Sequence, residues 1–201
     1  MLILHALWLV WRAVHLHHLF MKDLVYKGMT FEPYITRDEI RQQVERVAAE
    51  IKRDCQTRNP LFVCVLNGAF IFAADLFRAC DIPEAEITFI RFKSYEGTSS
   101  TGQVKQIMGL TEDIAGREII IVEDIVDTGV TAVQMRKMLA EHNPKSVKMA
   151  SLLFKPDSLK QGGAPEYVGF NIPSKFILGY GLDLDGLARN LSDIYVLKQE
   201  K

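Results

Sequence analysis

Val122-Glu123-Asp124-Ile125-Val126-Asp127-Thr128-Gly129-Val130-Thr131 is the stretch that decides the fold of this 201-residue chain. Residues 119–122, which lead into it, form an uninterrupted β-branched run of the kind found in parallel strands covered on both faces. Because acidic residues are not expected to continue such a strand, Glu123 and Asp124 are predicted at its carboxyl end, where open α/β sheets bind ligands. The stretch therefore predicts an α/β protein with a site at this strand end.

The side chains of the same stretch indicate what this site binds. Ionised Glu123 and Asp124 are pure acceptors, which suits ribose hydroxyls or a bound magnesium ion. Residues 128–131 offer consecutive backbone N–H groups, a glycine and two hydroxyls at the start of a predicted helix, where anions bind readily. An isolated Asp-Thr-Gly could be only a turn and helix cap. The complete string, with acids before it and a strand behind it, instead predicts a sugar-phosphate site.

The string resembles the phosphoribosyl-diphosphate motif of the type I phosphoribosyltransferases, and in detail their hypoxanthine-guanine branch. The resemblance covers roughly residues 27–197 and includes separate blocks in the family's order, at residues 65–70, 91–95, 150–155 and 173–183. It implies the α/β type I phosphoribosyltransferase fold, a central and mainly parallel sheet flanked by helices, with a small hood over the base site.

The resemblance also implies a reaction, in which a 5-phosphoribosyl group passes from phosphoribosyl diphosphate to N9 of hypoxanthine or guanine and diphosphate leaves. Magnesium is the implied cofactor. Glu123 and Asp124 would hold the ribose and magnesium, and Asp183 would serve a second magnesium site. The 5′-phosphate would be held by the loop made of Asp127, Thr128, Gly129, Val130 and Thr131.

Asp127 has a second implied role as the catalytic general base. Its position resembles that of the family carboxylate that faces purine N7, the nitrogen that must lose a proton as N9 bonds to carbon. The alternative is that Asp127 only caps the loop.

Diphosphate binding is assigned through the resemblance to Asn67, Gly68 and Arg189. The family suggests a cis peptide bond between Leu66 and Asn67 that orients an N–H group towards diphosphate. Several relatives have lysine where this chain has Asn67, so a backbone contact stays possible there and a side-chain charge contact does not. For Arg189, a surface salt bridge is the alternative.

The resemblance assigns the purine to Lys155, Lys175, Phe176, Ile177 and Asp183. A lysine that follows an apolar strand needs solvent or an acceptor for its ammonium group, and the family analogue of Lys155 donates to the purine 6-oxo group. Adenine presents a donor at that position, so we expect 6-oxopurines to be accepted and adenine rejected. Phe176 would stack on the base, the alternative being an ordinary core phenylalanine.

A lid over the site is expected around Ser94 and Tyr95. Residues 94–106 are rich in serine, threonine and glycine and hold little that could be buried, which predicts a mobile loop. A closing lid would protect phosphoribosyl diphosphate from water.

The remaining pattern predicts alternating helices and strands. A capping box at Thr36 and Glu39 predicts a helix with a buried stripe of Ile40, Val44, Val47, Ala48 and Ile51. Strands are expected at residues 61–66, 87–92 and 146–154, and helices at 69–80, where Phe70, Ala73, Leu76 and Phe77 share a face, and 131–142. This alternation is typical of a parallel sheet.

Composition excludes several classes of protein. With 48% hydrophobic residues the chain can bury one sizeable core. A net charge of -1 does not indicate the positively charged surface that nucleic-acid binding requires. The three cysteines (55, 64 and 80) lack C-x-x-C spacing, which indicates a reduced, cytoplasmic protein. Beyond residue 20 the only histidine is His142, which argues against a histidine-based mechanism.

Residues 1–20 differ from the rest of the chain. They are mainly apolar and hold both tryptophans and a histidine cluster at residues 15–18. They lack the basic start and the cleavage site of a secretory signal. Arg12 and the histidines weaken a membrane span, and a metal site would lack acidic or cysteine partners. We expect an N-terminal extension outside the fold, a natural start at Met21, a single domain over residues 21–201, and no membrane partner.

Two other functions stay open. One is a regulator that keeps the fold and binds a nucleotide or phosphoribosyl diphosphate, and the other is a phosphoribosyltransferase for adenine, uracil or orotate. Backbone carbonyls near Ile177 and Asp183 are expected to contact purine position 2, so the sequence does not rank hypoxanthine, guanine and xanthine. The family also suggests a homo-oligomer, either a dimer or a tetramer.

Overall fold

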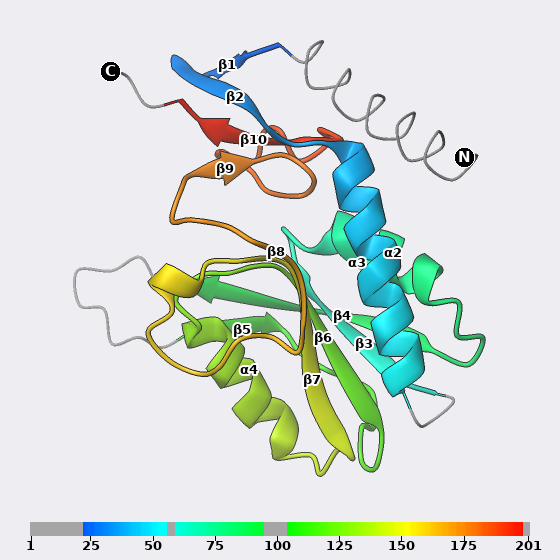
Figure 1. Cartoon of the computed structure of the whole chain (residues 1–201). Helices are drawn as coiled ribbons and strands as arrows, with labels where there is room; N and C mark the ends of the chain where they lie inside the picture. The colour runs from blue at the N-terminus through cyan, green and yellow to red at the C-terminus, as the bar shows by residue number, and fades with distance from the viewer. Residues whose placement is uncertain (1–21, 56–58, 95–103, 199–201) are drawn as a thin grey trace, which may run out of the picture. The chain divides into compact units, whose positions relative to one another are not determined.

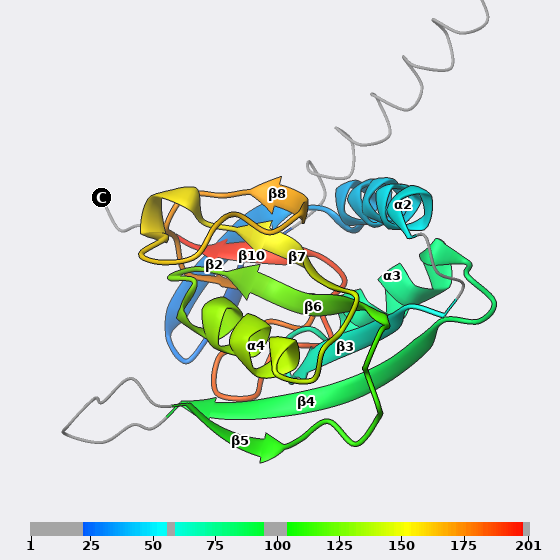
Figure 2. The same cartoon turned by 90° about the horizontal axis from the view of Figure 1, so that it is seen from below.

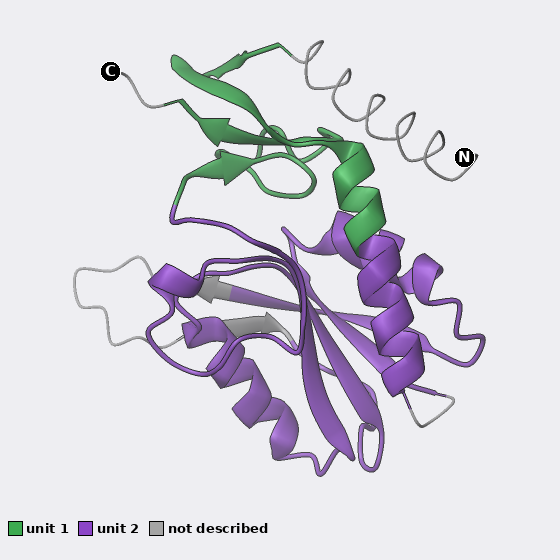
Figure 3. Cartoon of the chain, in the orientation of Figure 1, with its two compact units in different colours: residues 1–43, 175–201 green, residues 44–174 purple. Residues whose placement is uncertain are grey.

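The computed structural model describes residues 22–55, 59–94 and 104–198 and divides the chain into two compact units. The larger unit is residues 44–174, and the smaller one joins the two ends of the chain, residues 1–43 and 175–201 (Figure 3). The expected extension at residues 1–20 and the lid residue Tyr95 lie outside the described residues.

A six-stranded sheet forms the centre of the larger unit, in the order β5-β4-β3-β6-β7-β8 (Figure 1). Its strands are β3 (Leu61–Leu66), β4 (Glu86–Ser94), β5 (Val104–Met108), β6 (Glu118–Val126), β7 (Ser146–Phe154) and β8 (Tyr167–Asn171). All neighbouring pairs are parallel except β4 and β5, which confirms the predicted mainly parallel sheet. The expected loop at residues 94–106 is partly wrong, because β5 begins at Val104 and pairs with β4.

Helices cover both faces of this sheet (Figures 1 and 2). On one face, α4 (Val130–Ala140) packs Ala132, Met135 and Leu139 against a core of β3 and β6 side chains. On the other face lies α3 (Phe70–Cys80), whose Phe77 ring meets the Phe62 ring of β3 edge to face at 5.3 Å. A short 3-10 helix, η1 (Pro156–Ser158), follows β7 directly.

The predicted capping box starts α2 (Arg37–Asp54), the helix that runs from the smaller unit into the larger. The Thr36 N–H donates to Glu39 Oε2 at 2.8 Å, and the Glu39 N–H donates to Thr36 Oγ1 at 3.2 Å. The whole predicted stripe is buried, namely Ile40, Val44, Val47, Ala48 and Ile51. Local capping and hydrophobic periodicity therefore account for this helix.

The predicted face of α3 is wrong at Phe70, whose side chain is 42% exposed. The buried residues of this helix are Phe72, Ala73, Leu76 and Cys80. At about 100° per residue, Phe70 lies roughly a quarter turn from the centre of that stripe, in the first turn of the helix. Its aromatic character suggested burial, but helical phase places it at the surface.

The predicted end of β6 is also wrong, because the strand continues through Glu123 and Asp124 to Val126. The ladder to β7 explains the difference, since it pairs Glu123 with Ser151 and Val126 with Phe154 beyond the apolar run. The helix that follows begins at Val130 and ends at Ala140, slightly before the expected bounds. Both acids still lie near the carboxyl end of the strand.

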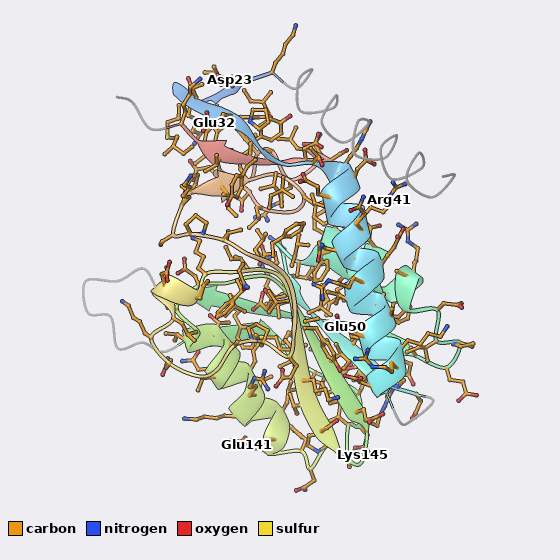
Figure 4. The ribbon with its side chains drawn as sticks, in the orientation of Figure 1. Asp23, Glu32, Arg41, Glu50, Glu141 and Lys145 are labelled. Atoms are coloured by element: carbon orange, nitrogen blue, oxygen red, sulfur yellow. The ribbon has the colours of Figure 1, made fainter. Side chains whose placement is uncertain are left out.

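A four-stranded antiparallel sheet organises the smaller unit, in the order β1-β2-β10-β9. Its strands are β1 (Leu24–Tyr26), β2 (Met29–Ile35), β9 (Ile177–Leu178) and β10 (Ile194–Leu197). Their core contains Phe31, Leu178, Ala188 and Tyr195. In Figure 4, the labelled residue Glu32 lies on β2 of this sheet, and Asp23 lies just before β1.

Within the part of the chain that the structure describes, no helix is long and apolar enough to cross a membrane.

Thiol chemistry gives a first test of the core. Cys64 and Cys80 are buried, and burial raises the pKa of each thiol to about 12. Burial followed by the charge of Glu118 also raises the pKa of Cys55, which is only partly buried. Because the thiolate is the reactive form, we expect a disulfide reagent at pH 8 to modify Cys64 and Cys80 at least tenfold more slowly in folded than in urea-unfolded protein. Mass spectrometry of each cysteine measures this; equal rates would contradict the described core.

Candidate active site

A pocket of about 220 Å³ lies where β6 ends and α4 begins. Figure 4 shows Glu141 and Lys145 beyond the far end of α4, before β7 starts, so the pocket lies at the opposite edge of the sheet. The residues that line it are Glu123, Ile125, Val126, Asp127, Thr128, Gly129, Thr131 and Ala132. Five of these were proposed from the sequence for ribose, metal or phosphate.

The turn before α4 has the geometry of an anion site. Gly129 is the residue before the helix and has a φ of 80°, a left-handed conformation that favours glycine. A Cβ at Gly129 would also lie 2.1 Å from the carbonyl oxygen of Gln161, so no side chain fits there. The first N–H groups of a helix have no partner within it and attract negative charge. Val130, which is also predicted for the 5′-phosphate loop, is not among the residues that line the pocket.

Lys155 contacts the proposed catalytic carboxylate. Its ammonium lies 3.0 Å from Asp127 Oδ2, and its backbone N–H donates to the carbonyl of Val126 at 2.9 Å. Lys155 is only 9% exposed, and a lysine so buried is rarely found without a paired charge. Parallel pairing of β6 and β7 brings the two residues together, because both follow the ends of their strands. A cationic donor and an anionic acceptor therefore stand side by side in the site.

Glu123 and Asp124 form an acidic pair next to this turn. Burial, followed by the negative charge of Asp124, raises the pKa of the Glu123 carboxyl well above its usual range. Asp124 Oδ1 accepts the Ile125 N–H at 2.8 Å, which fixes the orientation of that carboxylate. A bound cation would relieve the repulsion between the two acids, so their chemistry fits a metal ion.

The donor set fits magnesium in particular. Among the described residues, no group of three or more His, Cys, Asp or Glu side chains is placed to hold a metal by itself. Magnesium needs no such cage, since it is usually bound by one or two carboxylates together with waters and substrate phosphates.

Gly68 lies directly against the carboxylate of Asp124. The peptide bond between Leu66 and Asn67 is cis, as the resemblance implies. A Cβ at Gly68 would lie 1.6 Å from Asp124 Oδ2, so the turn after β3 approaches the carboxylate of β6 as closely as a bare backbone permits. The sequence predicted Gly68 near diphosphate but gave no indication of its contact with Asp124.

Asp183 and Arg189, which were predicted for different ligands, are paired with each other in the smaller unit. The Arg189 guanidinium lies 2.6 Å from Asp183 Oδ1 and donates to the carbonyl of Gly181 at 2.6 Å. The Gly186 N–H donates to Asp183 Oδ2 at 2.6 Å. The salt bridge that was the alternative for Arg189 is thus present. Its partner is Asp183, which was itself predicted for magnesium and purine binding.

Phe176 is 46% exposed, which rules out an ordinary core phenylalanine. Its ring packs tilted on that of Phe31, with centroids 6.1 Å apart, so one side of the ring is supported within the smaller unit. The neighbouring Ile177 is buried in β9, and the Lys175 ammonium lies 5.8 Å from the centroid of the Tyr34 ring. Residues 175–177 thus combine an exposed aromatic ring with a buried residue of β9.

Several pocket residues were not found from the sequence. Ile125, Val126 and Ala132 line the pocket, but apolar residues in a strand and a helix carry no signal of that role. Lys160 and Gln161, which do not line the pocket, donate their main-chain N–H groups to the carbonyl of Thr128 in the turn before α4. The adjacent Gly162 and Gly163 indicate a turn, although not what that turn packs against.

Residues 36–185 match the family model described as phosphoribosyl transferase domain, and the chain belongs to this family. Its relatives include hypoxanthine-guanine phosphoribosyltransferases. That of Streptococcus pneumoniae strain R6 is 38% identical over 167 residues, 83% of this chain and 92% of the relative. That of Mycobacterium tuberculosis strain H37Rv is 36% identical over 180 residues, 86% of this chain and 89% of the relative.

Solved structures agree with this assignment. The Bacillus anthracis hypoxanthine-guanine phosphoribosyltransferase superposes with a TM-score of 0.79 at 37% identity, covering 83% of this chain and 98% of that one. The Trypanosoma cruzi hypoxanthine phosphoribosyl transferase, studied for the role of its C-terminal region in oligomeric state and activity, gives 0.80 at 35% identity, covering 87% and 94%. The fold is therefore that of the type I phosphoribosyltransferases, as predicted.

Proposed function

We propose that this chain is a purine-salvage enzyme that transfers the 5-phosphoribosyl group of phosphoribosyl diphosphate to N9 of hypoxanthine or guanine, giving IMP or GMP and diphosphate. One observation carries the proposal: the Asp127–Lys155 pair lies beside the pocket where β6 ends and α4 begins. The turn at residues 127–131, which joins these two elements, is called the phosphate turn below. The names of the relatives support the same activity.

The sugar-phosphate half of the reaction belongs to the pocket. The turn from Asp127 to Thr131 would hold the 5′-phosphate through backbone N–H groups and the Thr128 and Thr131 hydroxyls. Glu123 and Asp124 would accept hydrogen bonds from the ribose hydroxyls. These contacts would hold C1′ in place while its bond to diphosphate breaks and an oxocarbenium-like sugar forms.

The purine half belongs to Asp127 and Lys155. Asp127 would accept the N7 proton as N9 bonds to C1′, and Lys155 would donate to the 6-oxo oxygen. On the edge of a 6-oxopurine, the oxygen is an acceptor and protonated N7 is a donor, which matches the adjacent cation and carboxylate. Phe176 would stack on the base, Lys175, Ile177 and Asp183 would complete the base site, and Asn67, Gly68 and Arg189 would bind diphosphate.

We also propose magnesium as the cofactor. Glu123 and Asp124 would hold it, with Asp183 at a second site, and the bound ion would supply positive charge that stabilises the leaving diphosphate. The repulsion between the neighbouring carboxyl groups of Glu123 and Asp124, which a cation would relieve, supports a cation at this pair.

A magnesium-dependent assay with phosphoribosyl diphosphate and a panel of bases tests the function. Turnover with hypoxanthine, guanine or both, and none with adenine, uracil or orotate, is the expected result. Turnover with another base would identify a different enzyme of the same fold. No turnover with any base would favour the regulator that only binds phosphoribosyl diphosphate.

Replacing Lys155 tests purine recognition. In Lys155→Met the apolar stem remains and the donor is lost, so we expect the KM for hypoxanthine to rise about thirtyfold, as for loss of a charged hydrogen bond. The KM for phosphoribosyl diphosphate should change much less. Lys137→Met, at an exposed position on α4, is the matched control and should behave as wild type. An unchanged KM for hypoxanthine in Lys155→Met would contradict this role.

Four further properties remain proposals. The homo-oligomer, a dimer or a tetramer, is supported by the attention given to oligomeric state in the T. cruzi relative. A cytoplasmic location is supported by free cysteines among the described residues. Residues 21–201 would act as one domain, since the matched family region draws on both compact units. The lid role of Ser94 and Tyr95 also remains a proposal.

A further inference from the structure

The segment after Lys155 lies along the phosphate turn. It begins with the contacts of Lys155 to Val126 and Asp127 and passes through η1, whose hydrogen bonds include Ser158 N–H to the Lys155 carbonyl at 3.1 Å. It then reaches the turn a second time. At that point the N–H groups of Lys160 and Gln161 both donate to the carbonyl oxygen of Thr128, at 3.0 and 3.3 Å.

Steric contacts reinforce this second attachment. A Cβ on Gly129 would lie 2.1 Å from Gln161 O and 2.8 Å from Leu159 Cδ1, so the segment and the turn are in close contact. A little further on, a Cβ on Gly162 would lie 2.9 Å from Val133 Cγ2 on α4. The side chains of Lys160 and Gln161 are exposed, so the attachment is made by their main chain.

Peptide geometry gives these hydrogen bonds a consequence for the site. In a trans peptide the carbonyl and the following N–H point in opposite directions. The only cis bond among the described residues is Leu66–Asn67, so the Thr128–Gly129 peptide is trans. Two donors that hold the Thr128 carbonyl towards residues 160–161 therefore turn the Gly129 N–H away from them.

We propose that Lys160 and Gln161 form a main-chain strut that holds the Gly129 N–H towards the 5′-phosphate and so sets the affinity for the phosphoribosyl donor. The inference rests on the sugar-phosphate site of the proposed function. The segment that carries the strut begins at Lys155, the proposed purine contact, so one short segment would position both ends of the site. Lys160 and Gln161 are positioning residues, since they act through Thr128 and Gly129.

Lys160→Pro removes the backbone N–H of residue 160, which donates to the Thr128 carbonyl, whereas Lys160→Ala keeps this N–H. Leu159 has φ -64° and ψ 120°, a conformation that a residue preceding proline adopts readily. We expect Lys160→Pro to bind ribose 5-phosphate about tenfold more weakly by calorimetry, the upper range for loss of one hydrogen bond. The KM for phosphoribosyl diphosphate should rise by a similar factor and that for hypoxanthine less than twofold. Lys160→Ala should match wild type in all three.

Unchanged ribose 5-phosphate binding by folded Lys160→Pro would overturn the strut, and so would equal losses for donor and purine, which indicate general loosening. Should this variant not fold by circular dichroism, amide exchange in the wild-type chain decides. Protection of the Gly129 N–H by ribose 5-phosphate supports the strut, and equal exchange with and without it overturns it. Wild-type protein that binds ribose 5-phosphate but turns over no base would refute the proposed enzyme while leaving the strut intact.

Discussion

Asp127→Asn is expected to lower kcat with hypoxanthine or guanine by at least about a hundredfold, the usual range for removal of a general base. Asparagine keeps the shape of the side chain and one oxygen that can accept from Lys155, which lies 3.0 Å from the wild-type carboxylate. It lacks the basicity needed to take the N7 proton. The KM for phosphoribosyl diphosphate should change little, because the backbone of the phosphate turn is untouched. Steady-state kinetics with each substrate varied separately measures both quantities.

Asp157→Asn is the matched control for this experiment. Asp157 is exposed in η1, close in sequence to Lys155, and does not line the pocket. Its replacement by asparagine removes one negative charge, as Asp127→Asn does. It should retain wild-type turnover. If Asp127→Asn also turned over at close to the wild-type rate, Asp127 would be only a capping residue of the turn, the alternative that its sequence position leaves open.

The elements that could be predicted are those whose boundaries are set locally. β3 and β7 occupy the predicted residues because each is an apolar run that ends at polar residues or a turn. The start of α2 follows from a capping box that needs only two nearby residues. Boundaries set by partners were missed: β6 is prolonged by its ladder to β7, and β5 exists through its pairing with β4.

The same distinction applies to the site. The turn at residues 127–131 could be located because strand, acids, glycine and hydroxyls are consecutive in the chain. Lys155 and Asp127 could be brought together by the rule that neighbouring parallel strands end at one edge. The pairing of Asp183 with Arg189 depends on a loop with several left-handed residues, including Tyr180, Asp185 and Ala188, whose path no local pattern specifies.

Gly68→Ala is expected to damage the site severely. The added Cβ would lie 1.6 Å from Asp124 Oδ2 and 2.5 Å from its Cγ, so the carboxylate must move. Movement would break its 2.8 Å hydrogen bond with the Ile125 N–H and displace an acceptor from the proposed ribose and metal site. We expect kcat/KM for phosphoribosyl diphosphate to fall at least about a hundredfold, the scale of a misplaced reactive geometry. Overpacking should also lower the free energy of unfolding by about 1 to 3 kcal/mol.

Gly163→Ala separates this clash from a general effect of replacing glycine. A Cβ at Gly163 has no heavy atom within 4 Å, so that variant should match wild type in kinetics and in urea unfolding. Magnesium titration of the rate adds a further measurement, because a displaced Asp124 should raise the concentration needed for half-maximal activity. Wild-type kinetics in Gly68→Ala would mean that the backbone of the Asn67-Gly68 turn moves instead of the carboxylate. The close approach of β3 and β6 at this point would then have no part in positioning Asp124 for catalysis.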